Sequence, residues 1–391
     1  MDNIMKKDMH YYCIFSLARA AGIDPIRSKT IAYSSQYVDD SIFKDIKTHK
    51  DGGKLVSEAT AHHFYNISNM NKNDQREIWV PFHFLPGAEG ISLSEKLICK
   101  KNSKLASAVL KKGITTALSN VPYGLHAFGI SLHTFADTFA HYGFSGVSSR
   151  RNRVKGSSIK ILSKNSSELN LIKNKTNKFF KKYGEQGGKV ENFRSKKSYK
   201  NKYLKAPLKK IYNIIANEGA ELASGALGHG AVSTHPDLPF LKWSYEYEYK
   251  SLMQNGVILR NNFDDYLEAC EHIFNSLVQY SKLHNIDNKS IPEFYDIKTS
   301  IKNILSIVGK KIDRINGWKK SYNNGEFTGI IGEEIPNYDR SIWQSQKDNF
   351  GKLYSSNLIS SSNIYNFYTA ASFHKQYVIK SLLPKYGIII Y

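Results

Sequence analysis

The chain has 391 residues, of which 41% are hydrophobic and 13% aromatic, and its 55 Lys and Arg against 34 Asp and Glu give a formal charge of +21. That apolar content is sufficient for a sizeable core and excludes an intrinsically disordered chain. The positive excess favours polyanionic partners such as nucleic acid, anionic lipid headgroups or phosphorylated metabolites.

Three scattered cysteines, Cys13, Cys99 and Cys270, form no CxxC pair. They exclude a disulfide framework and a thiolate zinc module. No apolar run approaches the roughly 18 residues of a transmembrane helix. The first residues lack the pattern of a signal peptide. We therefore expect a cytoplasmic protein, with export by a dedicated secretion system left open.

Capping signals and periodicity predict an all-α chain. Asp8 is a candidate N-cap for a helix through Ala21, closed by Gly22, and Asp24-Pro25 opens a second helix toward Asp40. Residues 51–100 are interrupted by Gly52-Gly53, Pro81 and Pro86-Gly87 and are expected to form loops with short helices. A helix is predicted from about residue 120 to Gly143, and further helices over 206–226, 262–283, 295–316 and 360–383.

A strongly basic segment interrupts this pattern. Residues 150–210 hold 20 Lys and Arg against 3 acidic residues, a net charge of +17. The segment is interpreted as a solvated insertion or as an electrostatic arm that recruits a phosphate-rich substrate. The residues assigned to polyanion binding are Arg150, Arg151, Arg153, Lys181, Lys182, Lys196 and Lys197.

The predicted helix ending at Gly143 carries the most informative pattern. At about 100° per residue, four potential ligands fall within about 80° of arc: His126, His133, Asp137 and His141. Large apolar side chains occupy the opposite face. We expect the polar face to point into a polar cavity, where imidazole and carboxylate groups at one-turn spacing converge on one or two cations. His133, Asp137 and His141 are the predicted ligands, and His126 is either an outer ligand or a hydrogen-bond partner of one.

One helix supplies too few ligands, so further candidates come from elsewhere in the chain. They are His10, the paired Asp39 and Asp40, His62 and His63, Glu221, His229, His235 and Asp237. The two aspartates stand at a helix C-terminus, where the helix dipole disfavours them, which suggests a nearby cation. His83, between Pro81 and Pro86, is interpreted as a pocket wall. Such a set is expected of a helical site with two or three metals.

Several motifs together resemble an uncharacterised bacterial family of unknown function over about residues 5–250. They are Asp8-x-His10-Tyr-Tyr, Ser35-Gln-Tyr-Val-Asp-Asp40, Pro81-Phe-His-Phe-Leu-Pro86, His133-Thr-Phe-Ala-Asp137-Thr-Phe-Ala-His141-x-x-Phe-Ser-Gly146 and Gly228-His-Gly230 with Pro236-Asp237. The resemblance to this family implies no particular reaction.

The order of these groups is more distantly similar to the superfamily of zinc-dependent phospholipase C and S1/P1-type nucleases. That resemblance implies an all-helical bundle with three clustered metals that cleaves phosphoesters. It implies as ligands His10, Asp40 (or Asp39), His62 (or His63), His133, Asp137, His141 and His229, with Asp137 bridging. The HxxxE pair of that superfamily is absent, because Ser233 stands four residues after His229.

The leading hypothesis is a metal-dependent phosphoesterase, with phospholipid favoured over nucleic acid, and with two or three zinc ions, or manganese or iron. Whichever of Asp39 and Asp40 is not a ligand would act as general base, and Asp237 or Glu221 would orient the water. Peripheral membrane contact is a further expectation. The alternatives are an S1/P1-type nuclease and a non-catalytic, metal-stabilised helical protein that binds a polyanion. A phosphohydrolase of the HD type is disfavoured, because no His is followed directly by Asp.

The expected organisation is a helical catalytic domain over 1–285 with a basic insertion at about 147–205, and a helical extension over 286–391 packed on it. The aromatic run from Trp243 to Tyr249 is interpreted as core, with base stacking or lipid contact as alternatives.

Overall fold

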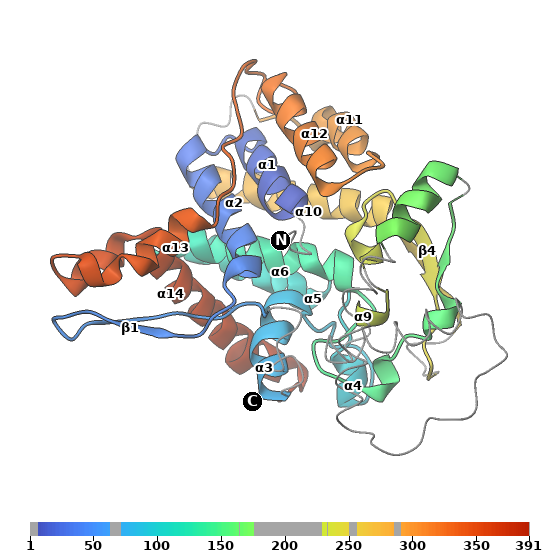
Figure 1. Ribbon diagram of the computed structural model, residues 1–391, viewed down its shortest axis with the longest axis horizontal. Coiled ribbons are helices and arrows are strands. Elements are labelled where there is room, and N and C mark those ends of the chain that lie inside the picture. Colours follow the sequence, from blue (N-terminus) through green and yellow to red (C-terminus); the bar gives the residue numbers. More distant parts are fainter. Residues whose placement is uncertain are drawn as a thin grey trace.

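The computed structural model describes residues 7–62, 72–163, 165–175, 229–232, 234–249, 256–284 and 291–390. Within these ranges the chain is mostly helical, with two small antiparallel sheets (Figure 1). The all-α prediction is confirmed at this level. No helix in the described ranges is long and apolar enough to cross a membrane.

Helix α6 is the central element of the bundle (Figure 1). It contacts α2, α5, α10, α14 and the π-helical segment η3, and all but one of its residues are buried. The elements around it are η1 (Asp8–Cys13), α1 (Ile14–Ala20), α2 (Pro25–Asp40), η3 (Gln75–His83), α5 (Lys104–Leu118), α6 (Gly124–His141) and α10 (Asn262–Leu283).

The start of the chain departs from the predicted cap. Asp24 caps α2 as expected, because its side chain accepts from the backbone N–H groups of Ile26 and Arg27. Asp8 caps nothing; it lies inside η1, buried, and its carboxylate accepts a hydrogen bond from Arg314. A buried carboxylate paired with a buried guanidinium is a tertiary contact that helix-capping rules do not detect.

Close approach of α2 to α6 depends on Gly129. A Cβ at this position would lie 2.3 Å from the backbone oxygen of Ile31 and 2.7 Å from Cβ of Ser34. The absent side chain therefore lets the two helices pack backbone to backbone. That packing brings the end of α2 beside the middle of α6.

The smaller elements connect the central helices. The hairpin β1–β2 pairs Ile46 with Val56, and the three-stranded sheet has the order β3-β4-β5. Their bounds, with those of the neighbouring short helices, are β1 (Ile46–Thr48), β2 (Lys54–Val56), α3 (Lys72–Asp74), α4 (Leu93–Lys96), η4 (Arg150–Asn152), η5 (Gly156–Ser158), β3 (Lys160–Ile161), a helix over 166–175, α9 (His229–Val232), η6 (His235–Asp237), β4 (Lys242–Tyr245) and β5 (Ile258–Asn261).

A second, smaller core forms around β4. Trp243, Tyr245 and Tyr247 are buried there with Phe84 and Phe144. The aromatic run beginning at Trp243 therefore serves core packing over these positions, as expected.

The C-terminal part consists of α11 (Phe294–Leu305), α12 (Lys311–Asn323), α13 (Ser341–Asp348), η7 (Phe350–Lys352), η8 (Ser356–Ser361), α14 (Asn363–Gln376), η9 (Tyr377–Leu382) and η10 (Leu383–Tyr386). The single helix predicted over 295–316 is wrong, because Ser306 ends α11 and α12 begins at Lys311, where Asp313 accepts from the backbone N–H of Lys310. The helix over 206–226 lies outside the described residues, whereas those at 262–283 and 360–383 are confirmed.

Candidate metal centre

Histidine and aspartate side chains from four elements converge on the middle of α6. His10 comes from η1, Asp39 from the last turn of α2, His83 from the end of η3, and His133 and Asp137 from α6. All five are buried. Two overlapping groups, His10–Asp39–His133 and His83–His133–Asp137, each bring their ligand atoms within 4.8 Å of one another. His133 belongs to both groups.

Asp137 is the carboxylate at the centre of this cluster. Its Oδ1 lies 3.2 Å from Nε2 of His10, and its Oδ2 lies 2.9 Å from Nδ1 of His83 and 3.3 Å from Nε2 of His133. Burial raises the pKa of Asp137, but the neighbouring His141 and His133 outweigh burial and hold the pKa well below its usual range. Asp137 is therefore an ionised carboxylate with both oxygens facing imidazole nitrogens.

The hydrogen bond from His83 to Thr60 decides the tautomer of His83. Nε2 of His83 lies 2.9 Å from the backbone oxygen of Thr60, and since a carbonyl can only accept, Nε2 carries the proton. In the neutral ring, the lone pair of Nδ1 then faces Oδ2 of Asp137 and lies 3.3 Å from Nε2 of His133. Electron-rich atoms held this close require a proton or a metal cation between them.

His10 and His133 lie face to face. Their ring centroids are 4.0 Å apart with an interplanar angle of 27°. Within the described part of the chain, Nδ1 of His10 and Nδ1 of His133 make no hydrogen bond, whereas Nε2 of His10 faces Asp137. Burial, together with the neighbouring His10, lowers the pKa of His133 to about 3, so this imidazole is neutral and competent as a ligand.

His141 and Asp39 lie at the two ends of the cluster. His141 donates from Nδ1 to the backbone oxygen of His83 at 2.7 Å, and the same nitrogen lies 3.6 Å from Oδ2 of Asp137. Asp39 is oriented by Gln36, which donates from Nε2 to its Oδ2 at 3.3 Å, while Oδ1 lies 3.7 Å from Nε2 of His133. Such backbone and side-chain partners fix the tautomer and direction of ligand groups.

Several predicted site residues lie outside the two groups. Asp40 accepts a hydrogen bond from Tyr338 at 2.6 Å and lies 3.9 Å from Arg340, so the structure turns Asp39 toward the cluster and Asp40 away from it. His62 lies 3.6 Å from Asp74. Nε2 of His126 lies 3.1 Å from Oδ1 of Asn363.

The remaining candidates are distributed as follows. His235 is buried beside Trp243 and donates to the backbone oxygen of Val232, Asp237 lies partly exposed in η6, Arg151 is exposed, and Arg153 lies 3.8 Å from Glu248. His63, Glu221, Lys181, Lys182, Lys196, Lys197 and the side chains of Arg150 and His229 lie outside the described residues.

Among the described residues, the polar face of α6 packs against η1, η3 and α2. A small cavity nevertheless lies beside the cluster, between η1, α6 and α10. His10 and Asp137 supply its polar wall, and its apolar wall is formed by Met9, Ala136, Phe139, Tyr266 and Ala269.

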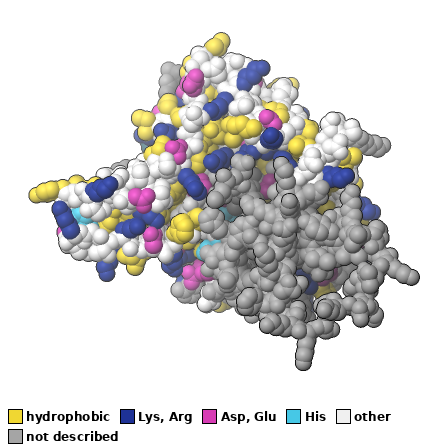
Figure 2. Space-filling model, viewed as in Figure 1, with side chains coloured by type: hydrophobic (Ala, Val, Ile, Leu, Met, Phe, Trp, Pro, Cys, Tyr) yellow, Lys and Arg dark blue, Asp and Glu magenta, His cyan; other side chains and the backbone are white. Residues whose placement is uncertain are grey.

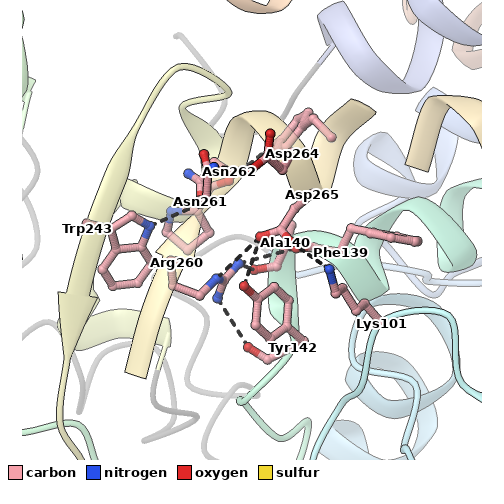
Figure 3. A network of polar contacts seen from close by, with 12 residues as sticks. Lys101, Phe139, Ala140, Tyr142, Trp243, Arg260, Asn261, Asn262, Asp264 and Asp265 are labelled. Carbon is pink, nitrogen blue, oxygen red and sulfur yellow. Dashed lines mark hydrogen bonds and ion pairs between the residues drawn. The ribbon is translucent and has the colours of Figure 1, made fainter. Parts of the chain in front are cut away.

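The end of α6 is held by Arg260, a contact that the sequence does not reveal. The guanidinium donates to the backbone oxygens of Phe139, Ala140 and Tyr142 and stacks 3.6 Å from the centre of the Tyr142 ring (Figure 3). Asp265 accepts from the Tyr142 hydroxyl at 2.8 Å and pairs with Lys101 at 3.0 Å. This network anchors the turn of α6 that carries His141.

Fold and site together define a mostly helical protein with a buried cluster of His and Asp that could hold metal. The model of DUF6765, a family of unknown function, matches residues 5–382, and the chain belongs to that family. No curated protein and no solved structure matches the chain.

Proposed function

We propose that this protein is a metal-dependent hydrolase of phosphoric esters, with phospholipid as the favoured substrate class. The observation that carries the proposal is the cavity bounded by His10 and Asp137, because it has room for about one water molecule beside the ligand cluster. A closed shell of protein ligands is typical of a structural metal, whereas an open position is typical of a catalytic one.

The donor set suits a divalent cation. The candidate ligand residues are His10, Asp39, His83, His133, Asp137 and His141. Two carboxylates among imidazoles suit zinc, manganese or iron, and the two overlapping groups support more than one ion. Such ions would supply positive charge that neutralises phosphate oxygens and acidifies a water molecule.

The chain's own residues would divide the remaining work. Asp137, ionised and central, would hold the imidazoles of His10 and His133 in register. Thr60 and Gln36 orient His83 and Asp39 through the hydrogen bonds described above. Met9 and Phe139 would exclude bulk water from the cavity, which strengthens electrostatic interactions inside it.

One observation favours a second candidate, a non-catalytic helical protein stabilised by its metal. Every member of the two ligand groups is buried, and a buried His–Asp cluster can contribute folding free energy through its metal alone. A nuclease of the S1/P1 type remains the alternative substrate class for the catalytic proposal.

The test is hydrolysis by metal-loaded protein of phosphatidylcholine vesicles, single-stranded DNA and bis(p-nitrophenyl) phosphate. We expect metal-loaded wild type to hydrolyse phosphodiesters and Asp137→Asn to be inactive. Chelator treatment should abolish the activity of wild type, and added metal should restore it. Cleavage of DNA but not lipid would select the nuclease alternative. Stoichiometric metal with no hydrolysis of any of the three substrates would reject the catalytic proposal in favour of the second candidate.

A further inference from the structure

A protruding lobe of the molecule combines exposed apolar side chains with exposed lysines. It consists of residues 43–58, which include the β1–β2 hairpin, and residues 349–361, which include η7 and η8; we call it the hairpin projection. In Figure 1 both segments extend beside each other away from the helical bundle. In Figure 2 hydrophobic and basic side chains lie next to each other on this lobe.

Polar contacts fix the two segments together. His49 lies 2.9 Å through Nε2 from the backbone oxygen of Leu353, and Asp51 accepts from the backbone N–H of Ser356 at 2.7 Å. A two-stranded hairpin alone is marginally stable in water. Burial contributes little to the stability of this hairpin, since Leu55 is the only buried residue of its two strands. The contacts with residues 349–361 therefore hold the hairpin in place.

The apolar side chains of this surface are unusually exposed. Ile46 and Val56 are cross-strand partners, so they share one face of the hairpin, and they are 60% and 54% exposed. Tyr354 on the adjoining segment is 91% exposed. Phe43 and Leu358 are exposed as well. Five large exposed apolar side chains on one lobe, two of them direct cross-strand neighbours, indicate an interaction site.

The charges of the hairpin projection select its partner. Its residues include five Lys and three acidic residues, a formal balance of +2. Two of the three acids are paired with lysines outside the lobe, Asp45 with Lys347 and Glu58 with Lys375. All five lysines are exposed: Lys44, Lys47, Lys50, Lys54 and Lys352. A lobe that exposes both large apolar side chains and lysines matches the boundary between anionic headgroups and acyl chains.

We propose that the hairpin projection docks on the surface of an anionic lipid membrane, inserting Ile46, Val56 and Tyr354 between headgroups that its lysines neutralise. This site contains no residue of the metal cluster. The docking proposal is therefore independent of the proposed reaction, and Asp137→Asn is expected to bind vesicles as wild type does.

The experiment is co-sedimentation of the full chain with vesicles of phosphatidylcholine alone or with added phosphatidylglycerol. The test variant is Ile46→Ser with Val56→Ser and Tyr354→Ser. The matched control is Tyr295→Ser with Ile331→Ser, whose side chains are both 82% exposed but lie outside the lobe. Binding is measured at low salt and at about 0.5 M salt, where the Debye length of roughly 4 Å screens the basic insertion.

We expect wild type to bind vesicles that contain phosphatidylglycerol. In high salt, the test variant should bind these vesicles at least about tenfold more weakly than wild type, because it lacks the apolar side chains that insert. The control variant should stay within about twofold of wild type. Equal binding of the test variant and wild type in high salt would overturn the proposal, as would no vesicle binding by wild type. A solution dimer that dissociates only in the test variant would assign the surface to a second copy instead. Unchanged circular dichroism is expected in every variant, because all the substituted side chains are exposed.

Discussion

At the scale of single residues, the tautomer of His83 determines what the cluster can bind. Its Nε2 proton is committed to Thr60, so Nδ1 is directed at Asp137 and His133. His126, another buried histidine of this region, instead pairs with Asn363. The two residues therefore offer a direct comparison of a ligand candidate with a packing histidine.

We predict that His83→Gln lowers metal affinity by at least about 10- to 100-fold, whereas His126→Gln leaves it within about threefold. Glutamine can keep one hydrogen bond at either position but supplies no imidazole lone pair. Competition with a chromophoric chelator measures both affinities. Equal affinities in the two variants would remove His83 from the ligand set.

The neighbouring Asp39 and Asp40 make a second comparison. Asp39→Asn is expected to lose metal, because a carboxylate within 3.7 Å of His133 is replaced by a neutral amide. Asp40→Asn should keep metal but lose about 1–3 kcal/mol of folding free energy, since Tyr338 loses a charged acceptor. Metal content and urea unfolding of both variants check this; metal loss in Asp40→Asn alone would reverse the assignment.

At the scale of elements, α6 and the contacts that hold its ends position the site. Arg260 binds three backbone carbonyls at the C-terminal turn of α6, where a cation also interacts favourably with the helix dipole. Lys101 belongs to the same network through Asp265 but is partly exposed (Figure 3).

We predict that Arg260→Met lowers the free energy of unfolding by about 3–5 kcal/mol, because three backbone carbonyls lose their donor and the buried Asp265 loses a nearby positive charge. Lys101→Met should cost under about 1 kcal/mol, as is typical of exposed ion pairs. Arg260→Lys should recover only a minor part, because an ammonium cannot replace the planar fork. Urea denaturation measures all three, and an Arg260→Met cost no larger than that of Lys101→Met would contradict this role.

Much at this scale could be predicted from the sequence. The helical spacing of apolar residues and the stop signal at Gly143 predict helix α6. The His/Asp face of this helix carries half of the candidate ligands. The choice between Asp39 and Asp40 was beyond prediction, because adjacent residues differ by only about 100° on a helix. Which one faces α6 depends on the close α2–α6 packing at Gly129 and on Tyr338, about 300 residues away.

From the sequence, His83 between Pro81 and Pro86 is interpreted as part of a pocket wall rather than as a metal ligand. In the structure, Pro81 lies within the π-helical η3, which turns the His83 ring toward α6. Tertiary contacts from the C-terminal part, such as Arg314 with Asp8, likewise leave no local sequence signal.

At the scale of the whole molecule, buried histidines outside the cluster couple folding to pH. Burial lowers the pKa of His126 and of His374 to about 4. Because the unfolded chain binds protons near the ordinary histidine pKa of about 6.5, stability is fully present above pH 6.5 and falls as pH decreases toward 4.

We predict that each of these two histidines lowers the free energy of unfolding by about 3 kcal/mol between pH 7 and pH 4, because it is protonated in the unfolded chain but held neutral in the folded one. His374→Gln should flatten the dependence of stability on pH, whereas His284→Gln, which changes an exposed histidine, should not. Urea unfolding of chelator-treated protein across this range measures the effect without competition from metal. An unchanged slope in His374→Gln would show that His374 is not held neutral by burial.

The most direct test of the metal centre is elemental analysis of protein purified without an affinity-tag metal, with Asp137→Asn and Asp40→Asn prepared in parallel. We predict stoichiometric zinc, manganese or iron in wild type and in Asp40→Asn, and its loss in Asp137→Asn with the fold retained. No bound metal in wild type, and none taken up on titration, would mean that His10, His83, His133 and Asp137 form a buried hydrogen-bonded network. The metal-dependent function would then be excluded.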